Sequence, residues 1–404
     1  GDLDAAEATL AALHRAHPDH GEVAGTYDRL LVPRSRFDEA RSVARGSGPL
    51  AALRAEAAGL AAFYLGELED ADRAFAALET SADDDAAIGR ALSLRGMVAQ
   101  QRGQLALASE RYRDAARRLG ELGEVHAAAV AELNLGTVLA ERGRASEALP
   151  RLAAASRVFA DLGVTTEQIA ADLNRGNALL AVGLADDARR AAEAAIARGE
   201  GAPHLRAFAL LVLGDAKRRL GDAAGAERAY RDALAIGRER GDAHAQISAY
   251  IALAEAGHAP ARGADVEAVI ASDDDRDRWT IARARLDLAD ASASPTILLA
   301  AARACAEVAT RAAAADRLER GFRAHAVACK LAQRAGDTVL SRAQAERARA
   351  AHAAIVAAAA PAFRAALDAD PDLALLPVAE PAARAAAASE SAAHLRRLLT
   401  LSRR

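Results

Sequence analysis

Residues 125–163, VHAAAVAELNLGTVLAERGRASEALPRLAAASRVFADLG, contain the spacing that decides the fold. Gly143 follows Gly136 by seven residues, and Ala148 and Ala155 follow it by twelve and nineteen. This spacing predicts a helix, a tight turn at Gly143 and an antiparallel second helix, because glycine ends a helix in a conformation that is costly for other residues. We expect Gly136 and Ala148 to be small because the two helix axes cross closely there.

The same pattern recurs along the chain, which predicts a repeat protein. Counting outward from Gly136, the anchor glycines are Gly59, Gly96, Gly136, Gly176 and Gly214, spaced by 37, 40, 40 and 38 residues, and another glycine follows each by seven. Phe75, Tyr112 and Tyr230 stand sixteen residues after three of the anchors, where we expect them to fill space toward the next repeat. Asp70, Ser146 and Asp222 fall near the starts of second helices, where free N–H groups favour them.

Beyond residues 51–240 the pattern weakens but can be followed. We expect helix pairs at about 277–291 with 295–313 and at 317–335 with 338–358, and we expect the acidic runs 83–85 and 273–275 to lie at helix starts. We therefore predict a repeat array over 1–258, degenerate helical repeats over 259–367, and a proline-containing linker with a truncated C-terminal helix over 368–404. The ragged N-terminus and the leucines of that last helix suggest a piece of a larger chain.

The composition agrees with an all-α fold. Of the 404 residues, 117 are alanine, the best helix former, and only 13 are Phe, Trp or Tyr. Sheets need more β-branched and aromatic residues than this chain has. The sequence therefore predicts an all-α, right-handed superhelical solenoid of antiparallel helix pairs.

Charge and cysteine content exclude several classes. The net charge of −4, with no basic segment, argues against direct nucleic-acid binding. Charged residues interrupt every apolar run before a membrane span accumulates. Cys305 and Cys329 have no metal spacing and are predicted to be buried thiols in a reducing cytoplasm.

The glycine and alanine positions of residues 51–240 resemble the tetratricopeptide repeat (TPR) family, in its longer-repeat bacterial variety. The resemblance implies first helices that line a concave groove. The segment around APAFRAAL, the prolines after it and the final HLRRLLTLSRR resemble the junction at which bacterial regulators pass from TPR repeats to a GAF sensor and a sigma-54-activating ATPase.

We find no motif for a cofactor, a nucleotide or catalysis, and we predict a chain that is not an enzyme. His14, His17 and His20 could attract a metal, but Pro18 would splay them, so we favour a solvated repeat junction. His126, His204 and His244 each lie ten residues before their anchors and are expected to make structural contacts along one edge.

The groove remains as the candidate site. The TPR resemblance places a polar strip on its concave face, with asparagines in the middle and arginines at one end. Asparagine offers a donor and an acceptor, which suits the backbone of an extended peptide. In the alternative interpretation, Asn134 and Asn174 act as struts, which means that their side chains bond backbone groups between neighbouring repeats. The predicted partner-binding residues are Met97, Gln100, Gln101, Asn134, Thr137, Glu141, Asn174, Asn177, Asp215, Arg218 and Arg219.

Two functions fit this groove. The favoured one is a scaffold that binds a peptide, a protein segment or domains of its own parent chain, within a signalling or transcription regulator. The alternative is a small-ligand sensor whose superhelix changes on binding, which would need a closed apolar pocket. The leucine stripe at 395–401 suggests a homodimer contact or a mobile end.

Overall fold

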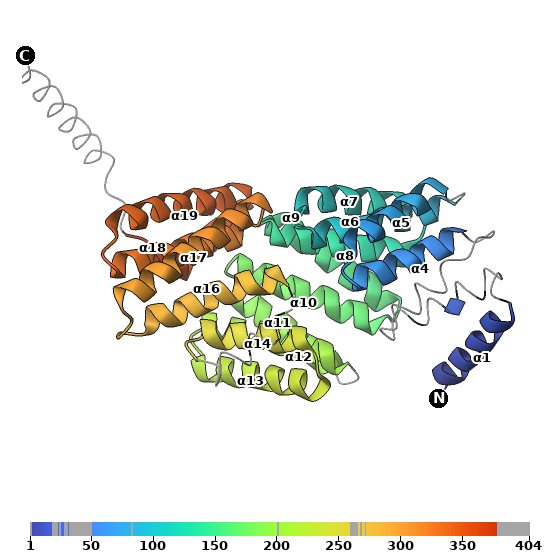
Figure 1. Cartoon of the computed structure of the whole chain (residues 1–404), viewed down its shortest axis with the longest axis horizontal. Coiled ribbons are helices and arrows are strands. Elements are labelled where there is room, and N and C mark those ends of the chain that lie inside the picture. The colour runs from blue at the N-terminus through green and yellow to red at the C-terminus, as the bar shows by residue number, and fades with distance from the viewer. Residues whose placement is uncertain are drawn as a thin grey trace, which may run out of the picture.

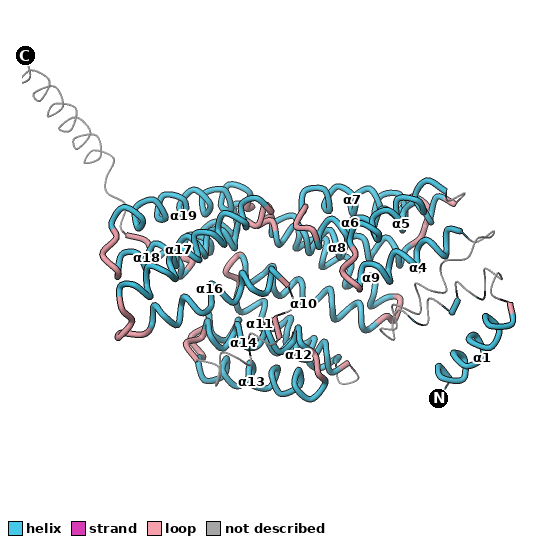
Figure 2. Tube along the Cα trace, viewed as in Figure 1, coloured by secondary structure: helices cyan, strands magenta, loops and turns pink. Residues whose placement is uncertain are grey.

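The computed structural model describes residues 2–17, 23, 26–27, 31, 51–81, 84–199, 202–258, 266, 269–270 and 272–377. Within these residues the chain forms helices and no strand (Figures 1 and 2). The elements are α1 (Asp2–Ala16), α4 (Ala51–Tyr64), α5 (Leu68–Ser81), α6 (Asp85–Gln101), α7 (Leu105–Glu121), α8 (Val125–Glu141), α9 (Ala145–Asp161), α10 (Thr165–Ala181), α11 (Ala185–Arg198), α12 (Pro203–Arg219), α13 (Ala223–Arg240), α14 (Ala243–Glu255), α16 (Asp273–Ala289), α17 (Pro295–Ala314), α18 (Leu318–Arg334), α19 (Thr338–Ala358), α20 (Pro361–Asp368) and the 3₁₀ helix η3 (Pro371–Leu375).

Helices that are consecutive in the chain pack against each other, and first helices also pack on the first helices of neighbouring pairs. The predicted pairs in the degenerate region are present as α16 with α17 and α18 with α19. Ala148 and Ala226, the small residues of the second helices, are completely buried. The antiparallel-pair solenoid predicted from the glycine spacing is therefore confirmed.

The turn glycines adopt the backbone conformation that the spacing predicts. Gly66, Gly103, Gly143, Gly183 and Gly221 have φ between 74° and 84°, in the left-handed region. In each turn the glycine amide donates to the carbonyl three residues earlier, which ends the first helix. A residue with a Cβ would be strained at these positions.

Three of the anchor glycines lie against an aromatic ring of their own helix pair. A Cβ on Gly59 would lie 2.4 Å from the Phe75 ring, and one on Gly214 would lie 2.3 Å from the Tyr230 ring. The rings also pack toward the next repeat, as predicted, because Phe75 shares a buried cluster with Val98 of α6, Tyr112 with Leu135 of α8, and Tyr230 with Ile247 of α14. Each ring covers the anchor glycine sixteen residues before it, which is why the anchor must lack a side chain.

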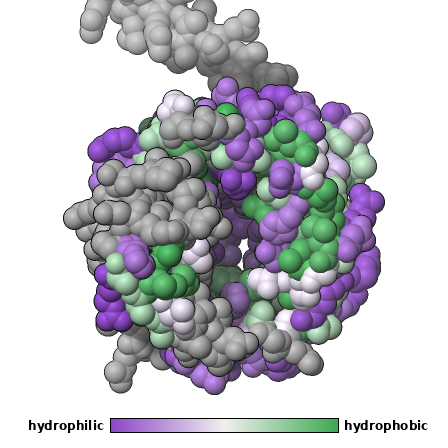
Figure 3. Space-filling view, turned by 90° about the vertical axis from the view of Figure 1, so that its right-hand side faces the viewer, coloured by the Kyte–Doolittle hydropathy of each residue, from purple (hydrophilic) through white to green (hydrophobic). Residues whose placement is uncertain are grey.

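The solenoid bends back on itself, so that its C-terminal helices lie against the turns that follow α6, α8 and α10. In Figure 1, α17, α18 and α19 lie beside α9, level with α4 to α9, while α10 to α16 form the opposite side. The end-on view of Figure 3 shows atoms surrounding a central opening. The array therefore curves around a central opening.

Several of the sequence predictions concern segments near the two ends of the chain. Most residues of 18–50 and all of 378–404 lie outside the described residues, including the C-terminal leucines, and the domain boundaries stay predictions. Within the segment interpreted as a linker, η3 packs against α18. None of the described helices is long and apolar enough to span a bilayer. Cys305 and Cys329 are buried free thiols, as predicted.

Candidate functional site: the inner face of the first helices

One face of α8 shows where the predicted strip points. Asn134, Thr137 and Glu141 are spaced by three and four residues, so they share a face of the helix. The Glu141 carboxylate accepts a 2.7 Å hydrogen bond from Gln100 Nε2 of α6. It also lies 3.8 Å from Arg317, which immediately precedes α18. The Glu141 end of the strip is therefore held by α6 and by the C-terminal part of the chain.

The three asparagines of the strip are the only asparagines in the chain. Asn134 of α8 and Asn174 of α10 are half-buried, and Asn177 is exposed. Within the described part of the chain their side chains make no hydrogen bond, whereas Thr137 Oγ1 donates to the Leu133 carbonyl. The alternative that Asn134 and Asn174 act as struts therefore has no hydrogen bond to support it.

The α6 part of the strip is occupied by internal contacts. Met97 packs against the core formed around Tyr112, Leu135 and Leu139. Gln100 bonds Glu141 and also accepts from the Tyr112 hydroxyl at 3.2 Å. Gln101, at the end of α6, is exposed. Of these predicted residues, only Gln101 presents a largely open side chain.

At the charged end of the strip, the two arginines have different electrostatic surroundings. Asp215 accepts a 2.7 Å hydrogen bond from the Tyr230 hydroxyl. Arg218 lies 3.7 Å from both Asp215 and Glu255, so its charge is compensated. Arg219 has no ion pair within 4.0 Å among the described residues, and burial together with the nearby Arg323 lowers its pKa. Of the predicted pair, Arg219 is therefore the arginine without a direct ion pair, although Glu319, Asp370 and Asp215 are close enough to offset part of the lowering of its pKa.

The other side of the ring carries a network of ion pairs that sequence reasoning missed. Asp274 of α16 pairs with Arg317 and Arg320, and Arg323 pairs with Glu319. Arg285 binds the Asp372 carboxylate of η3 at 2.7 and 2.9 Å. Apart from Arg323 and Glu319, which are four residues apart on α18, the paired residues lie 43 to 87 positions apart in the degenerate region, so no repeat spacing points to them.

The electrostatics of Asp372 show how densely this network is packed. Burial alone would raise the pKa of its carboxyl, but Arg285, Arg323 and Arg219 lower it below its usual range. The carboxylates and guanidinium groups of this network therefore offset one another's charge.

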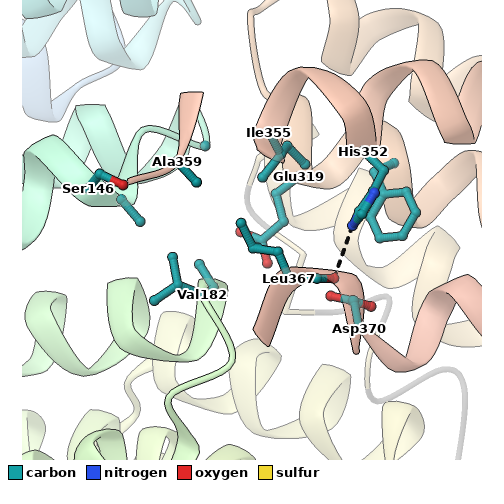
Figure 4. A pocket seen from close by; sticks show the side chains of 12 residues that line it. Ser146, Val182, Glu319, His352, Ile355, Ala359, Leu367 and Asp370 are labelled. Carbon is teal, nitrogen blue, oxygen red and sulfur yellow. Dashed lines mark hydrogen bonds between the residues drawn. The ribbon is translucent and has the colours of Figure 1, made fainter. Parts of the chain in front are cut away.

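A small cavity lies where the C-terminal helices meet α8 to α10 (Figure 4). Ser146, Val182, Glu319, His352 and Ile355 contribute to its wall. Its volume of about 10 Å³ holds roughly one water molecule. His352 Nε2 is 3.0 Å from the Leu367 carbonyl, which joins α19 to α20.

The remaining histidines make local contacts. His126 Nε2 lies 3.7 Å from Glu167 of the next first helix, and the His244 ring lies 5.3 Å from that of Phe208. In the described residues no three His, Cys, Asp or Glu side chains form a metal-binding group, and His20 lies outside them.

No protein-family model matches the chain, and no curated protein matches it. Among solved structures it is similar to a Rap protein complexed with competence and sporulation factor, at 13% identity and a TM-score of 0.62, over 85% of this chain and 100% of that chain. It is also similar to the apo form of RapI, at 12% identity and a TM-score of 0.53, over 82% of this chain and 97% of that one. At this identity the likeness shows the fold, which is a TPR-like helical solenoid.

Proposed function

We propose that the chain is a non-enzymatic TPR-like scaffold that holds a peptide or protein segment along the inner face of α8 and α10. The observation that carries this proposal is that Asn134, Asn174 and Asn177 lack hydrogen-bond partners within the described residues. Free amides on a polar inner face can pair with the N–H and C=O groups of an extended chain. The role that follows is regulatory, as a module of a larger bacterial signalling or transcription regulator.

The spacing of the helices sets the size of the partner. Neighbouring packed helices lie about 8–10 Å apart, so the path from α8 across α10 to α12 covers roughly 20 Å. An extended peptide covers about 3.3–3.6 Å per residue, so about six residues span this path. An acidic side chain or C-terminus at one end would meet Arg219, because Arg218 is already held between Asp215 and Glu255.

The structural likeness supports this proposal by analogy of fold. The Rap protein of similar architecture is in a complex with competence and sporulation factor. A solenoid of this architecture can therefore take up a partner, although site chemistry has to be argued from this chain's own residues. The small-ligand alternative needs a closed pocket and finds less support, since the cavity of Figure 4 has room for about one water molecule and a larger hollow of about 440 Å³ between α19 and α20 is wide open to solvent.

Binding to a random peptide library tests the proposal. We expect the purified chain to enrich extended peptides with a free acidic C-terminus or an acidic residue near one end. The double variant Asn134→Ala with Asn174→Ala should lower the affinity for a selected peptide at least about tenfold, because the lost hydrogen bonds leave buried groups of the peptide unpaired. Glu110→Ala, at an exposed position of the second helix α7, is the matched control and should bind normally.

Arg219→Glu should mainly slow association and reduce its salt dependence, whereas Arg218→Gln should act less on binding. Measurement by surface plasmon resonance at two salt concentrations separates these effects. If the double asparagine variant has a normal circular dichroism spectrum and unchanged peptide affinity, the inner-face proposal is wrong. A variant that unfolds instead would make these residues struts.

A further inference from the structure

The ring is closed by a short seam between two distant parts of the chain. On one side lie the turns that follow α6, α8 and α10, at Gly103, Gly143 and Gly183. A Cβ on these glycines would lie 3.0 to 3.5 Å from Ala315, Leu318, Ile355 or Ala366 of the C-terminal helices. The seam therefore joins a row of three repeat turns to the region from α17 to α20.

An aspartate stands at the centre of the seam in a backbone conformation that elsewhere belongs to glycine. Asp316, in the turn between α17 and α18, has a φ of 56° and is the only non-glycine with positive φ among the described residues. Its carboxylate accepts a 2.6 Å hydrogen bond from Arg142 Nε, 174 positions away. The left-handed conformation costs free energy for a residue with a Cβ. The interaction across the seam gives a physical reason for a side chain at this position.

Three further polar contacts accompany this pair. Arg142 Nη1 donates to Ser109 Oγ at 3.2 Å, and Arg317 lies 3.8 Å from Glu141. The Ala360 amide donates to Ser146 Oγ at 2.7 Å, although the sequence predicts only a helix-start role for this serine. Figure 4 shows Ser146 and Ala359 facing each other here.

No buried apolar cluster of the described residues spans the seam. Its closest approaches involve glycine turns with Ala315, Leu318, Ile355 and Ala366, beside a cavity of about 10 Å³. Adjacent helix pairs, by contrast, share clusters of buried side chains. A contact without such a cluster opens at a smaller cost than a packed core, and salt weakens the ion pairs in it.

We propose that the seam is a latch, through which the solenoid exchanges between a closed ring and an open superhelix, with the Arg142–Asp316 pair as its catch. Repeat arrays contact only their neighbours, so small rotations summed over several interfaces separate the two ends. In the open state the inner face is accessible from the side. If the proposed function is correct, a segment enters there and the latch closes around it.

Two variants remove the Arg142–Asp316 ion pair in different ways. Asp316→Gly removes the carboxylate and relieves the backbone at the same time, giving the turn the residue that other repeats have. Arg142→Ala removes the other partner and leaves the turn intact. Glu193→Ala breaks an exposed ion pair with Arg189 on α11, away from the seam, and is the matched control.

Spin-label distances report the state of the ring. Labels at Glu110→Cys on α7 and Arg342→Cys on α19, both exposed, lie on opposite sides of the seam, while the native cysteines are buried. In the labelled chain without further substitutions we expect two distances between the labels, one for the closed ring and one for the open superhelix. The fraction of the open state should rise with salt, because salt screens the Arg142–Asp316 ion pair. Asp316→Gly and Arg142→Ala should each raise the open fraction about fivefold and increase the radius of gyration in X-ray scattering, while the control changes neither.

A structural role for Asp316 alone predicts a different result. In that case Asp316→Gly would raise the melting temperature by relieving the turn and leave both distances unchanged. A single distance that neither variant nor 1 M salt alters would refute the latch. That outcome leaves the peptide-binding proposal intact, because the asparagine variants test it separately in the full chain.

Discussion

Replacing Gly214 with alanine provides a sharp test of how the repeats pack. The new Cβ would lie 2.3 Å from Tyr230 Cε1, about 1 Å closer than an ordinary contact. Tyr230 is fully buried, and its hydroxyl is held by Asp215 at 2.7 Å, so the ring cannot move without losing this hydrogen bond. Alanine gains about 1 kcal/mol of helix propensity over glycine. Overpacking costs about 1–3 kcal/mol and the hydrogen bond about 1 kcal/mol, so we expect a net loss of about 1–3 kcal/mol.

Gly120→Ala is the control, for which we expect the free energy of unfolding to change in the opposite direction. Gly120 lies in the last turn of α7, and nothing stands within 4 Å of an added Cβ. This variant should therefore stabilise the chain by up to about 1 kcal/mol. Urea denaturation followed by circular dichroism gives both changes from the midpoint and slope. If the two variants shift the midpoint in the same direction, the contact between the anchor glycine and the aromatic ring does not control stability as we argue.

Two further predictions concern buried residues. Ala148→Leu and Ala226→Leu should each cost about 1–3 kcal/mol by overpacking, and unchanged melting curves for both would contradict the repeat register. Burial raises the pKa of the Cys305 thiol from 9.0 to about 12, so the unfolded chain loses this proton first as pH rises. Stability should therefore decline between about pH 9 and 12, with a slope that is smaller in Cys305→Ala when urea midpoints are compared across this range.

Local features of the fold could be predicted from the sequence because they depend on residues close together in the chain. The glycine seven residues after each anchor ends a helix through its own backbone, whatever the rest of the protein does. Likewise, Asp222 caps α13 by accepting from the Gly225 amide, three residues away. Asp84 caps α6 in the same way, and Ser272 rather than an aspartate caps α16.

The candidate site could be predicted only in part. The TPR resemblance predicted Asn134, Asn174 and Asn177 on corresponding faces of adjacent first helices, but it could not show that their amides lack partners. It also treated Arg218 and Arg219 alike, because they are neighbours in sequence. Their different charge environments depend on Glu255 and Arg323, which other helices supply.

The sequence by itself determined the repeat, its helix pairs and the positions that must stay small, since these follow from turns and helix crossings within about 40 residues. Tertiary structure alone decided that the array closes, with Arg142 meeting Asp316 and Ser146 meeting Ala360 across 174 and 214 positions. Closure depends on the sum of small rotations between successive pairs. No single repeat encodes that sum, so a ring and an open superhelix share the same local pattern.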